Sequence, residues 1–189
     1  KKIFVGDFMD SFDRTPQNMS KCISLVLEAI AKGEAEAIFG NHELSYLNPS
    51  RHRCSGYSFK NNQILIQYEI EMRKVFKSHI LLTPSLLVTH AGLTKQIWDK
   101  ENLTLENLEE QLTEWWPDND SPVHQIGRYR GGRDAVGGTF WCDFRVEFEP
   151  VPGLTQVFGH TAGEGIRQKD NSYCIDCLDR EVTFLEMEM

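Results

Sequence analysis

Short apolar runs alternate with apolar residues at helical spacing in the first part of the chain. Residues 3–5 are apolar and run directly into a glycine, which is typical of a buried strand that ends in a turn. Thr15 and Pro16 then predict a helix start, with threonine as the N-cap and proline in the first helical position. A second short strand is predicted over residues 35–39. The apolar positions of the helix are Met19, Cys22, Ile23, Val26, Leu27 and Ile30.

The middle of the chain continues this alternation. A polar loop over residues 48–57 precedes a predicted long amphipathic helix. Residues 80–82 and 86–89 are apolar and flank Thr-Pro-Ser, which predicts two strands around a turn. A further helix is predicted before Pro117. The apolar face of the first helix comprises Ile64, Leu65, Tyr68, Met72, Val75 and Phe76, and that of the second Leu105, Leu108, Leu112 and Trp115.

The last third of the chain is richer in turns and strands. Residues 118–138 are polar and glycine-rich, which predicts a long surface loop. A strand is predicted over residues 155–158, and residues 172–178 and 182–188 are expected to form a closing hairpin. The order strand–helix–strand–helix, followed mostly by strands, predicts an α/β fold with layered mixed β-sheets flanked by helices.

Composition narrows the class of protein. A length of 189 residues, with no linker or repeat, predicts a single domain over residues 1–189. The formal net charge of −8 argues against a nucleic-acid groove, because binding to the phosphate backbone needs a basic surface. No apolar run approaches the roughly 18 residues of a membrane span, and no signal peptide is visible. Cys174 and Cys177 are expected to be buried structural thiols, which favours a reducing, cytoplasmic location.

Residues of the types that bind metals follow the predicted strands. Asp7, Asn41 with His42, His90 and His160 each lie beside a glycine or one residue from it. Ligands bind at the carboxyl ends of strands in α/β sheets, so four elements are expected to bring these side chains to one edge. A carboxylate, an amide oxygen and two imidazoles favour manganese, iron or zinc over calcium. A single Gly-Asp or histidine is usually structural, but the combination predicts a metal site.

These motifs together resemble those of the calcineurin-like metallophosphoesterases. Their order is Gly-Asp-x-x-Asp, Gly-Asn-His-Glu, His-Ala-Gly and Gly-His-Thr, and the likeness runs from Gly6 to about Glu186. It is greatest to the serine/threonine protein phosphatase branch, which includes phage and bacterial phosphatases and diadenosine tetraphosphatases. The resemblance implies a metallophosphoesterase-like fold and hydrolysis of phosphate esters by a metal-bound hydroxide. It also implies two divalent metals, with Mn²⁺ expected first and iron, zinc or nickel as alternatives.

The resemblance implies a ligand role for four residues. Asp7 matches the carboxylate that bridges the two metals, and Asn41, His90 and His160 match the other ligands of the second metal. The family's opening motif, Asp-x-His after a first strand, is absent and would lie one strand–helix unit before Lys1. The chain therefore offers a full ligand set for only one metal. We interpret it as an N-terminally truncated chain rather than a one-metal enzyme.

The resemblance also implies a catalytic group. His42 matches a proposed general acid beside the scissile bond, and Asp10 matches the carboxylate that orients it. Arg14 resembles the arginine that binds the substrate phosphate. Three residues separate Asp10 from Arg14, which departs from the family's Gly-Asp-x-x-Asp-Arg, so either Asp10 or Asp13 can be the orienting carboxylate.

Further arginines lie in the glycine-rich segment. Trp141 and Arg145 fall where the family often has a tryptophan followed by a second phosphate-binding arginine. Arg128, Arg130 and Arg133 are consistent with either a mobile lid that attracts phosphorylated substrates or a solvated loop, and we favour the loop.

Three functions follow from this sequence. The first is a serine/threonine protein phosphatase that also hydrolyses small phosphate esters. The second is a hydrolase of dinucleoside polyphosphates or other nucleotides, which shares the same core motifs. The third is a catalytically inactive metal- or phosphate-binding module, which the missing Asp-x-His motif favours.

Overall fold

The structure is a computed structural model that describes residues 1–10, 15–177 and 184–187. It contains two compact units, residues 1–78 and 79–189, and each is described by itself. That both belong to a single domain stays a prediction.

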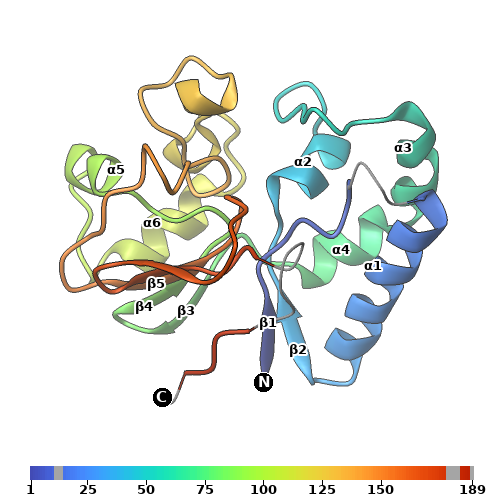
Figure 1. The fold of residues 1–189 in the computed structure, drawn as a ribbon, viewed down its shortest axis with the longest axis horizontal. Helices are drawn as coiled ribbons and strands as arrows, with labels where there is room; N and C mark the ends of the chain where they lie inside the picture. The colour runs from blue at the N-terminus through green and yellow to red at the C-terminus, as the bar shows by residue number, and fades with distance from the viewer. Residues whose placement is uncertain (11–14, 178–183, 188–189) are drawn as a thin grey trace. The chain divides into compact units, whose positions relative to one another are not determined.

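The first unit begins with a strand–helix–strand arrangement (Figure 1). Strands β1 (Lys2–Phe4) and β2 (Ala35–Ala37) pair in parallel, which needs a crossover connection such as a helix. Helix α1 (Pro16–Ala31) connects them and begins where the sequence predicts, because Thr15 accepts a hydrogen bond of 3.3 Å from the Asn18 amide. The carboxyl ends of β1 and β2 therefore lie side by side.

Helices account for most of the rest of this unit. Helix α2 (Asn41–Leu47) follows β2 directly and was not predicted. The predicted long amphipathic helix is two α-helices, α3 (Phe59–Leu65) and α4 (Glu69–Val75), joined by one 3-10 turn, η1 (Ile66–Tyr68). The tighter winding of the turn rotates the apolar face, so Val75 is 37% exposed, against the prediction. Among the side chains of that face that the structure describes, Leu65, Met72 and Phe76 are buried.

The second unit contains a five-stranded mixed sheet, as predicted. Its order is β3-β4-β5-β7-β6, with parallel strands in the centre and antiparallel edges. The strands are β3 (Ile80–Thr83), β4 (Leu86–Val88), β5 (Thr155–Phe158), β6 (Arg167–Lys169) and β7 (Ser172–Cys174). Because β4 and β5 are parallel neighbours, the segments that follow them leave the sheet at the same edge.

The predicted closing hairpin is wrong in its pairing. Strand β7 pairs with the preceding strand β6 through a two-residue turn, and residues 184–187 form no strand. Asp170 has a φ of 47°, a left-handed conformation that aspartate tolerates in tight turns. The edge strand reads Arg-Gln-Lys and has no apolar pattern, so the sequence did not mark it as a strand. Residues 178–183 and 188–189 lie outside the described part of the chain.

The segments between β4 and β5 are more ordered than predicted. Helix α5 (Lys95–Lys100) was not predicted, whereas α6 (Leu108–Trp115) confirms the helix before Pro117. The predicted surface loop contains two 3-10 turns, η2 (Pro122–His124) and η3 (Arg128–Arg130). It is not purely a surface loop, because some of its side chains are buried, namely Val123, His124 and Val136.

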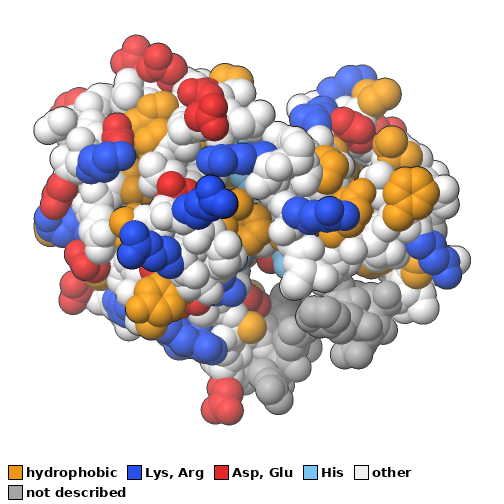
Figure 2. All heavy atoms as spheres, turned by 90° about the horizontal axis from the view of Figure 1, so that it is seen from above, with side chains coloured by type: hydrophobic (Ala, Val, Ile, Leu, Met, Phe, Trp, Pro, Cys, Tyr) orange, Lys and Arg blue, Asp and Glu red, His pale blue; other side chains and the backbone are white. Residues whose placement is uncertain are grey.

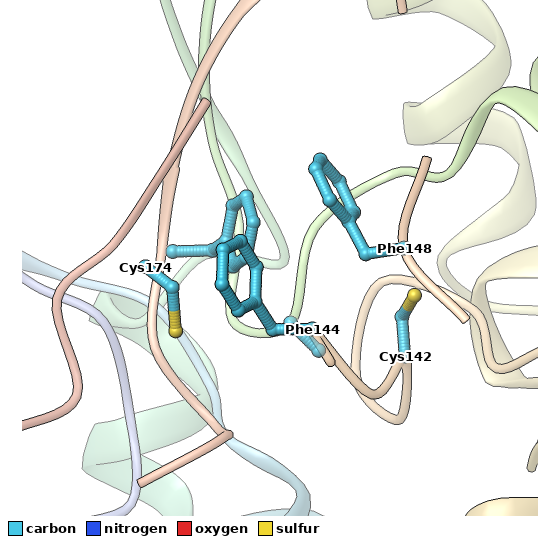
Figure 3. Close-up of a cluster of buried hydrophobic side chains, with 6 residues drawn as sticks. Cys142, Phe144, Phe148 and Cys174 are labelled. Carbon is cyan, nitrogen blue, oxygen red and sulfur yellow. The ribbon is translucent and has the colours of Figure 1, made fainter. Parts of the chain in front are cut away.

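An aromatic cluster forms part of the core of the second unit (Figure 3). The ring centroids of Phe148 and Phe158 are 4.6 Å apart, and Phe144 stacks on Phe148 at 5.9 Å. Cys142 and Cys174 lie on opposite sides of Phe144 in this view. Cys174 and Cys177 are buried and form no disulfide, which agrees with the prediction of buried thiols, and the cytoplasmic location stays a prediction.

Charge is dispersed over the face drawn in Figure 2. On the face drawn in Figure 2, basic side chains are interspersed with acidic and uncharged ones. Among the described residues, no helix has both the length and the apolar character needed to cross a membrane.

Candidate metal and phosphate site

The turn after β1 has an unusual backbone. Gly6, Asp7 and Asp10 have φ values of 92°, 60° and 59°. Left-handed conformations are uncommon for residues other than glycine and cluster at functional sites. The strain falls on Asp7 and Asp10, two residues that the sequence analysis assigned to the site.

A buried glutamate stabilises this turn. Glu43 is fully buried, and its carboxylate accepts four backbone hydrogen bonds. One oxygen accepts from Asp7 and Gly40, both at 2.8 Å, and the other from Phe8 at 2.8 Å and Met9 at 3.1 Å. The sequence analysis gave Glu43 no role, although its place in Gly-Asn-His-Glu, at the third position of a helix, is that of a capping glutamate.

Gly40 permits close contact between the two strand ends. A Cβ on Gly40 would come within 2.5 Å of the Asp7 amide nitrogen, so no side chain fits there. The carboxylate of Asp7 also accepts a hydrogen bond of 3.2 Å from the His42 amide. The Gly-Asp and Gly-Asn-His-Glu motifs are therefore joined within the first unit.

Asn41 forms two hydrogen bonds with a cysteine, Cys54. Asn41 is buried at the first position of α2, and its side-chain nitrogen donates to Cys54 Sγ at 3.1 Å. The Cys54 thiol donates to the Asn41 carbonyl at 3.2 Å. Burial, with a smaller effect from the charge of Asp7, raises the pKa of this thiol to about 12. The Asn41 side chain therefore has an oxygen suited to a hard metal and a nitrogen engaged by protein.

His42 and Asp10 form the predicted pair. His42 Nδ1 lies 3.4 Å from Asp10 Oδ2. The Tyr46 hydroxyl and the Asn61 side-chain amide donate to the other Asp10 oxygen, at 2.5 and 3.3 Å. This geometry suits Asp10 as the orienting carboxylate. The alternative, Asp13, lies outside the described residues, as does Arg14.

The His42 imidazole lies in an anionic environment. Burial alone would lower its pKa, but the hydrogen bond with Asp10 and the charges of Asp7 and Glu43 outweigh burial and raise the pKa to about 9. A raised pKa favours the protonated ring, which is the state that a general acid requires.

The second unit brings His90 and His160 together. They follow the parallel strands β4 and β5, and His160 has a left-handed φ of 66°. His90 Nε2 and His160 Nδ1 are 3.1 Å apart, and the ring planes are inclined by 70°. Two imidazole nitrogens that each bind one ion at roughly 2.0–2.1 Å lie about this far apart, so the pair suits a shared metal.

Arginines stabilise the segment after His160. Thr161 is 2% exposed, and its hydroxyl accepts from Arg130 at 2.8 Å and from the Phe144 amide at 3.0 Å. Arg145 donates to the Ala162 carbonyl at 2.7 Å. Trp141 packs edge-on against His160 with ring centroids 6.0 Å apart. A phosphate-binding role for Arg145 stays a prediction.

A second buried glutamate anchors the arginine-rich loop. Glu147 is 3% exposed and accepts backbone hydrogen bonds from Gly137 at 3.1 Å, Asp143 at 3.0 Å and Tyr129 at 3.4 Å. A Cβ on Gly127 would collide with the Glu147 side chain. The loop is therefore pinned at its base, which fits the predicted loop better than the alternative of a lid.

Comparisons with known proteins identify the family. A family profile described as calcineurin-like phosphoesterase matches residues 1–164. A search of curated proteins found no significant match. A solved structure titled "New Structure Of Cold-Active Protein Tyrosine Phosphatase At 1.1 Angstrom" shares 16% identity with this chain at a TM-score of 0.55. The match covers 92% of this chain and 58% of the solved chain. Another solved structure is a cold-active protein-tyrosine phosphatase of a psychrophilic Shewanella species. It shares 15% identity at a TM-score of 0.56, and the match covers 92% of this chain and 59% of the solved chain.

The chain thus spans less than two thirds of these solved chains, and at such identity they establish the fold alone. The family match covers most of the sequence, including the Gly-Asp, Gly-Asn-His-Glu, His-Ala-Gly and Gly-His-Thr motifs. The chain belongs to the calcineurin-like phosphoesterase family.

Proposed function

We propose that this chain provides the active site of a metal-dependent phosphatase that hydrolyses phosphoserine and phosphothreonine in proteins. The observation that carries the proposal is the His42–Asp10 pair beside the strained turn at Asp7. A module that only binds metal or phosphate has no need of a buried, doubly supported carboxylate behind a histidine.

The proposed metal ligands are Asp7, Asn41, His90 and His160. Their donors are a carboxylate, an amide oxygen and two imidazole nitrogens that lie 3.1 Å apart, a set that suits a divalent transition metal. We favour Mn²⁺. A second ion would need ligands in addition to Asp7. Divalent metals, when bound, polarise phosphoryl oxygens and lower the pKa of water.

The chain's own residues would handle the leaving group. The protonated His42 would donate its proton to the oxygen that departs from phosphorus. Asp10 would keep the imidazole in place through Nδ1, 3.4 Å away, so that Nε2 would be the nitrogen that donates. Tyr46 and Asn61 hold Asp10 in turn. A phosphate-binding role for Arg14 is part of the proposal.

The substrate class is the least constrained part of the proposal. The two solved relatives are titled protein tyrosine phosphatases, so phosphotyrosine is the first competitor to phosphoserine and phosphothreonine. Hydrolysis of dinucleoside polyphosphates is a second competitor, because the same core motifs serve both activities.

One experiment tests the proposal. The purified chain is assayed for metal content and for hydrolysis of p-nitrophenyl phosphate, with and without Mn²⁺, and then on phosphoserine, phosphothreonine and phosphotyrosine peptides and a dinucleoside tetraphosphate. His42→Ala should lower turnover by about 10²-fold or more while metal content is retained. Asp7→Ala should remove both metal and activity.

Each outcome has a defined meaning. Normal turnover of His42→Ala would remove His42 from catalysis. Full metal occupancy in Asp7→Ala would refute the proposed ligand set. Metal binding without hydrolysis of any substrate would favour the inactive binding module.

A further inference from the structure

Cys54 occupies a position that nothing in the family motifs assigns. It lies within the polar loop that follows α2, and the residue is 7% exposed. Its sulfur contacts the side-chain nitrogen of Asn41. A thiol is an uncommon partner for an amide in a protein core, because sulfur accepts hydrogen bonds only weakly.

The two hydrogen bonds between these residues give the amide a direction. Two main-chain carbonyls can accept the single Cys54 thiol proton, that of Asn41 at 3.2 Å and that of His52 at 3.8 Å, so the sulfur lone pairs face the Asn41 side chain. They accept from Asn41 Nδ2 at 3.1 Å. A flipped amide would place Oδ1 against the sulfur, and the single thiol proton could serve Oδ1 only by leaving the main-chain carbonyl, so the flip would cost one hydrogen bond. The contact therefore distinguishes the nitrogen end of the side chain from the oxygen end.

The position of Cys54 is itself fixed by α2. Its backbone N–H donates to the Ser45 hydroxyl at 3.0 Å, and Ser45 lies four residues after Asn41 on the same face of the helix. A turn in which the His52 and Arg51 amides both donate to the Asn48 carbonyl leads the chain back to this face. The sulfur is therefore held next to Asn41 by backbone contacts that do not involve the Asn41 side chain.

We infer that Cys54 is a positioning residue that holds the Asn41 amide with its oxygen presented to a divalent metal. The inference rests on the proposed function, in which Asn41 is a metal ligand. Residues behind metal ligands commonly change metal affinity by 10–100-fold through such orientation. Cys54 would act in this way through a weak sulfur acceptor in place of the usual oxygen.

The test compares Mn²⁺ affinity of the full chain by isothermal titration calorimetry, with Mn²⁺ alone as the probe. Cys54→Val removes donor and acceptor at similar volume and should weaken Mn²⁺ binding about 10-fold. Cys54→Ser keeps both hydrogen-bonding functions and should stay within about 3-fold of the unsubstituted chain. Cys177→Ala, which deletes a buried thiol in the other unit, is the control for thiol loss and should bind Mn²⁺ normally.

A double-mutant cycle separates positioning from general destabilisation. Asn41→Asp keeps a metal-binding oxygen but has no N–H₂ to give to sulfur, so adding Cys54→Val to it should cause no further loss of Mn²⁺ affinity. If Cys54 had only a structural role, Cys54→Val would lower Mn²⁺ affinity by the same factor with Asn41 and with Asn41→Asp. Thermal unfolding without metal checks that each variant is folded, and the cycle can be repeated with Cys54→Ala if the valine variant is not.

The possible failures are distinguishable. Equal Mn²⁺ affinity of Cys54→Val and the unsubstituted chain, or additive losses in the cycle, would overturn the role of Cys54 alone. Absence of Mn²⁺ binding in the unsubstituted chain would overturn the proposed metal site and this inference with it.

Discussion

Glu43 in the first unit and Glu147 in the second are both buried carboxylates that accept backbone N–H groups. Glu43 accepts four, none longer than 3.1 Å, and Glu147 accepts three, of which the longest is 3.4 Å. Each stands beside a glycine that has no room for a side chain, Gly40 or Gly127. The same device therefore appears in both units.

The difference lies in what each carboxylate holds. Glu43 binds the amide of Asp7, a proposed ligand, and shares a helical turn with Asn41. Glu147 holds a loop whose Arg130 reaches Thr161, the residue after His160. Glu43 therefore contacts a proposed ligand directly, whereas Glu147 is connected to His160 only through the loop with Arg130 and through Thr161. Similar buried interactions should therefore differ in their effect on the site.

The largest effect is expected for Glu43→Gln. The side-chain nitrogen of the new glutamine is a donor and would face backbone N–H groups that are donors too. These N–H groups would stay buried without an acceptor, which should lower the free energy of unfolding by about 3 kcal/mol or more. Mn²⁺ affinity should fall about 100-fold, since the Asp7 turn loses its support. Urea unfolding and calorimetry measure the two quantities. Exposed Glu114→Gln is the matched control, and if both variants behaved alike the directing role of Glu43 would be refuted.

An intermediate effect is expected for Glu147→Gln. Its unsatisfied amides should lower the free energy of unfolding by about 1–3 kcal/mol. Mn²⁺ affinity should fall only several-fold, by less than about 10-fold, because the loop does not carry the ligand itself. The same two measurements apply. If Glu147→Gln lost as much Mn²⁺ affinity as Glu43→Gln, both carboxylates would act directly on the metal site, and the proposed difference between them would be refuted.

The smallest effect is expected for Arg130→Gln. Arg130 donates to Thr161 and forms an ion pair of 2.9 Å with Asp143, but its side chain is 27% exposed, so water compensates part of the loss. We expect about 1 kcal/mol less stability and about a 3-fold change in Mn²⁺ affinity. Exposed Arg133→Gln should change neither. A loss of Mn²⁺ affinity above about 10-fold in Arg130→Gln would show that Arg130 acts on the metal site directly.

The sequence predicts the strands and the polar residues that end them because both signals are local. A short apolar run followed by glycine marks β1, and Thr15 with Pro16 marks the start of α1. The pairing of His42 with Asp10 was also predictable, although only through family resemblance. Asp13 and Arg14 were predicted with them and lie outside the described residues.

Other features depend on contacts between distant positions and leave no local mark. Strand β6 is a polar edge strand, recognised only by its pairing with β7. The partnership of Cys54 with Asn41 spans 13 residues and joins a loop to a helix that was itself missed. Glu43 offered a usable signal, since a glutamate at the third helical position is a known cap. The buried role of Glu147 had no such signal.

The first turn of α2 has a consequence for chain length. Successive residues in a helix are rotated by about 100°, so Asn41, His42 and Glu43 point in three directions: to the cysteine, to Asp10 and to the amides of the Asp7 turn. An inserted or deleted residue here would rotate every later side chain by that angle and break three partnerships together. A substitution here alters one of these partnerships, whereas a change in length alters all three.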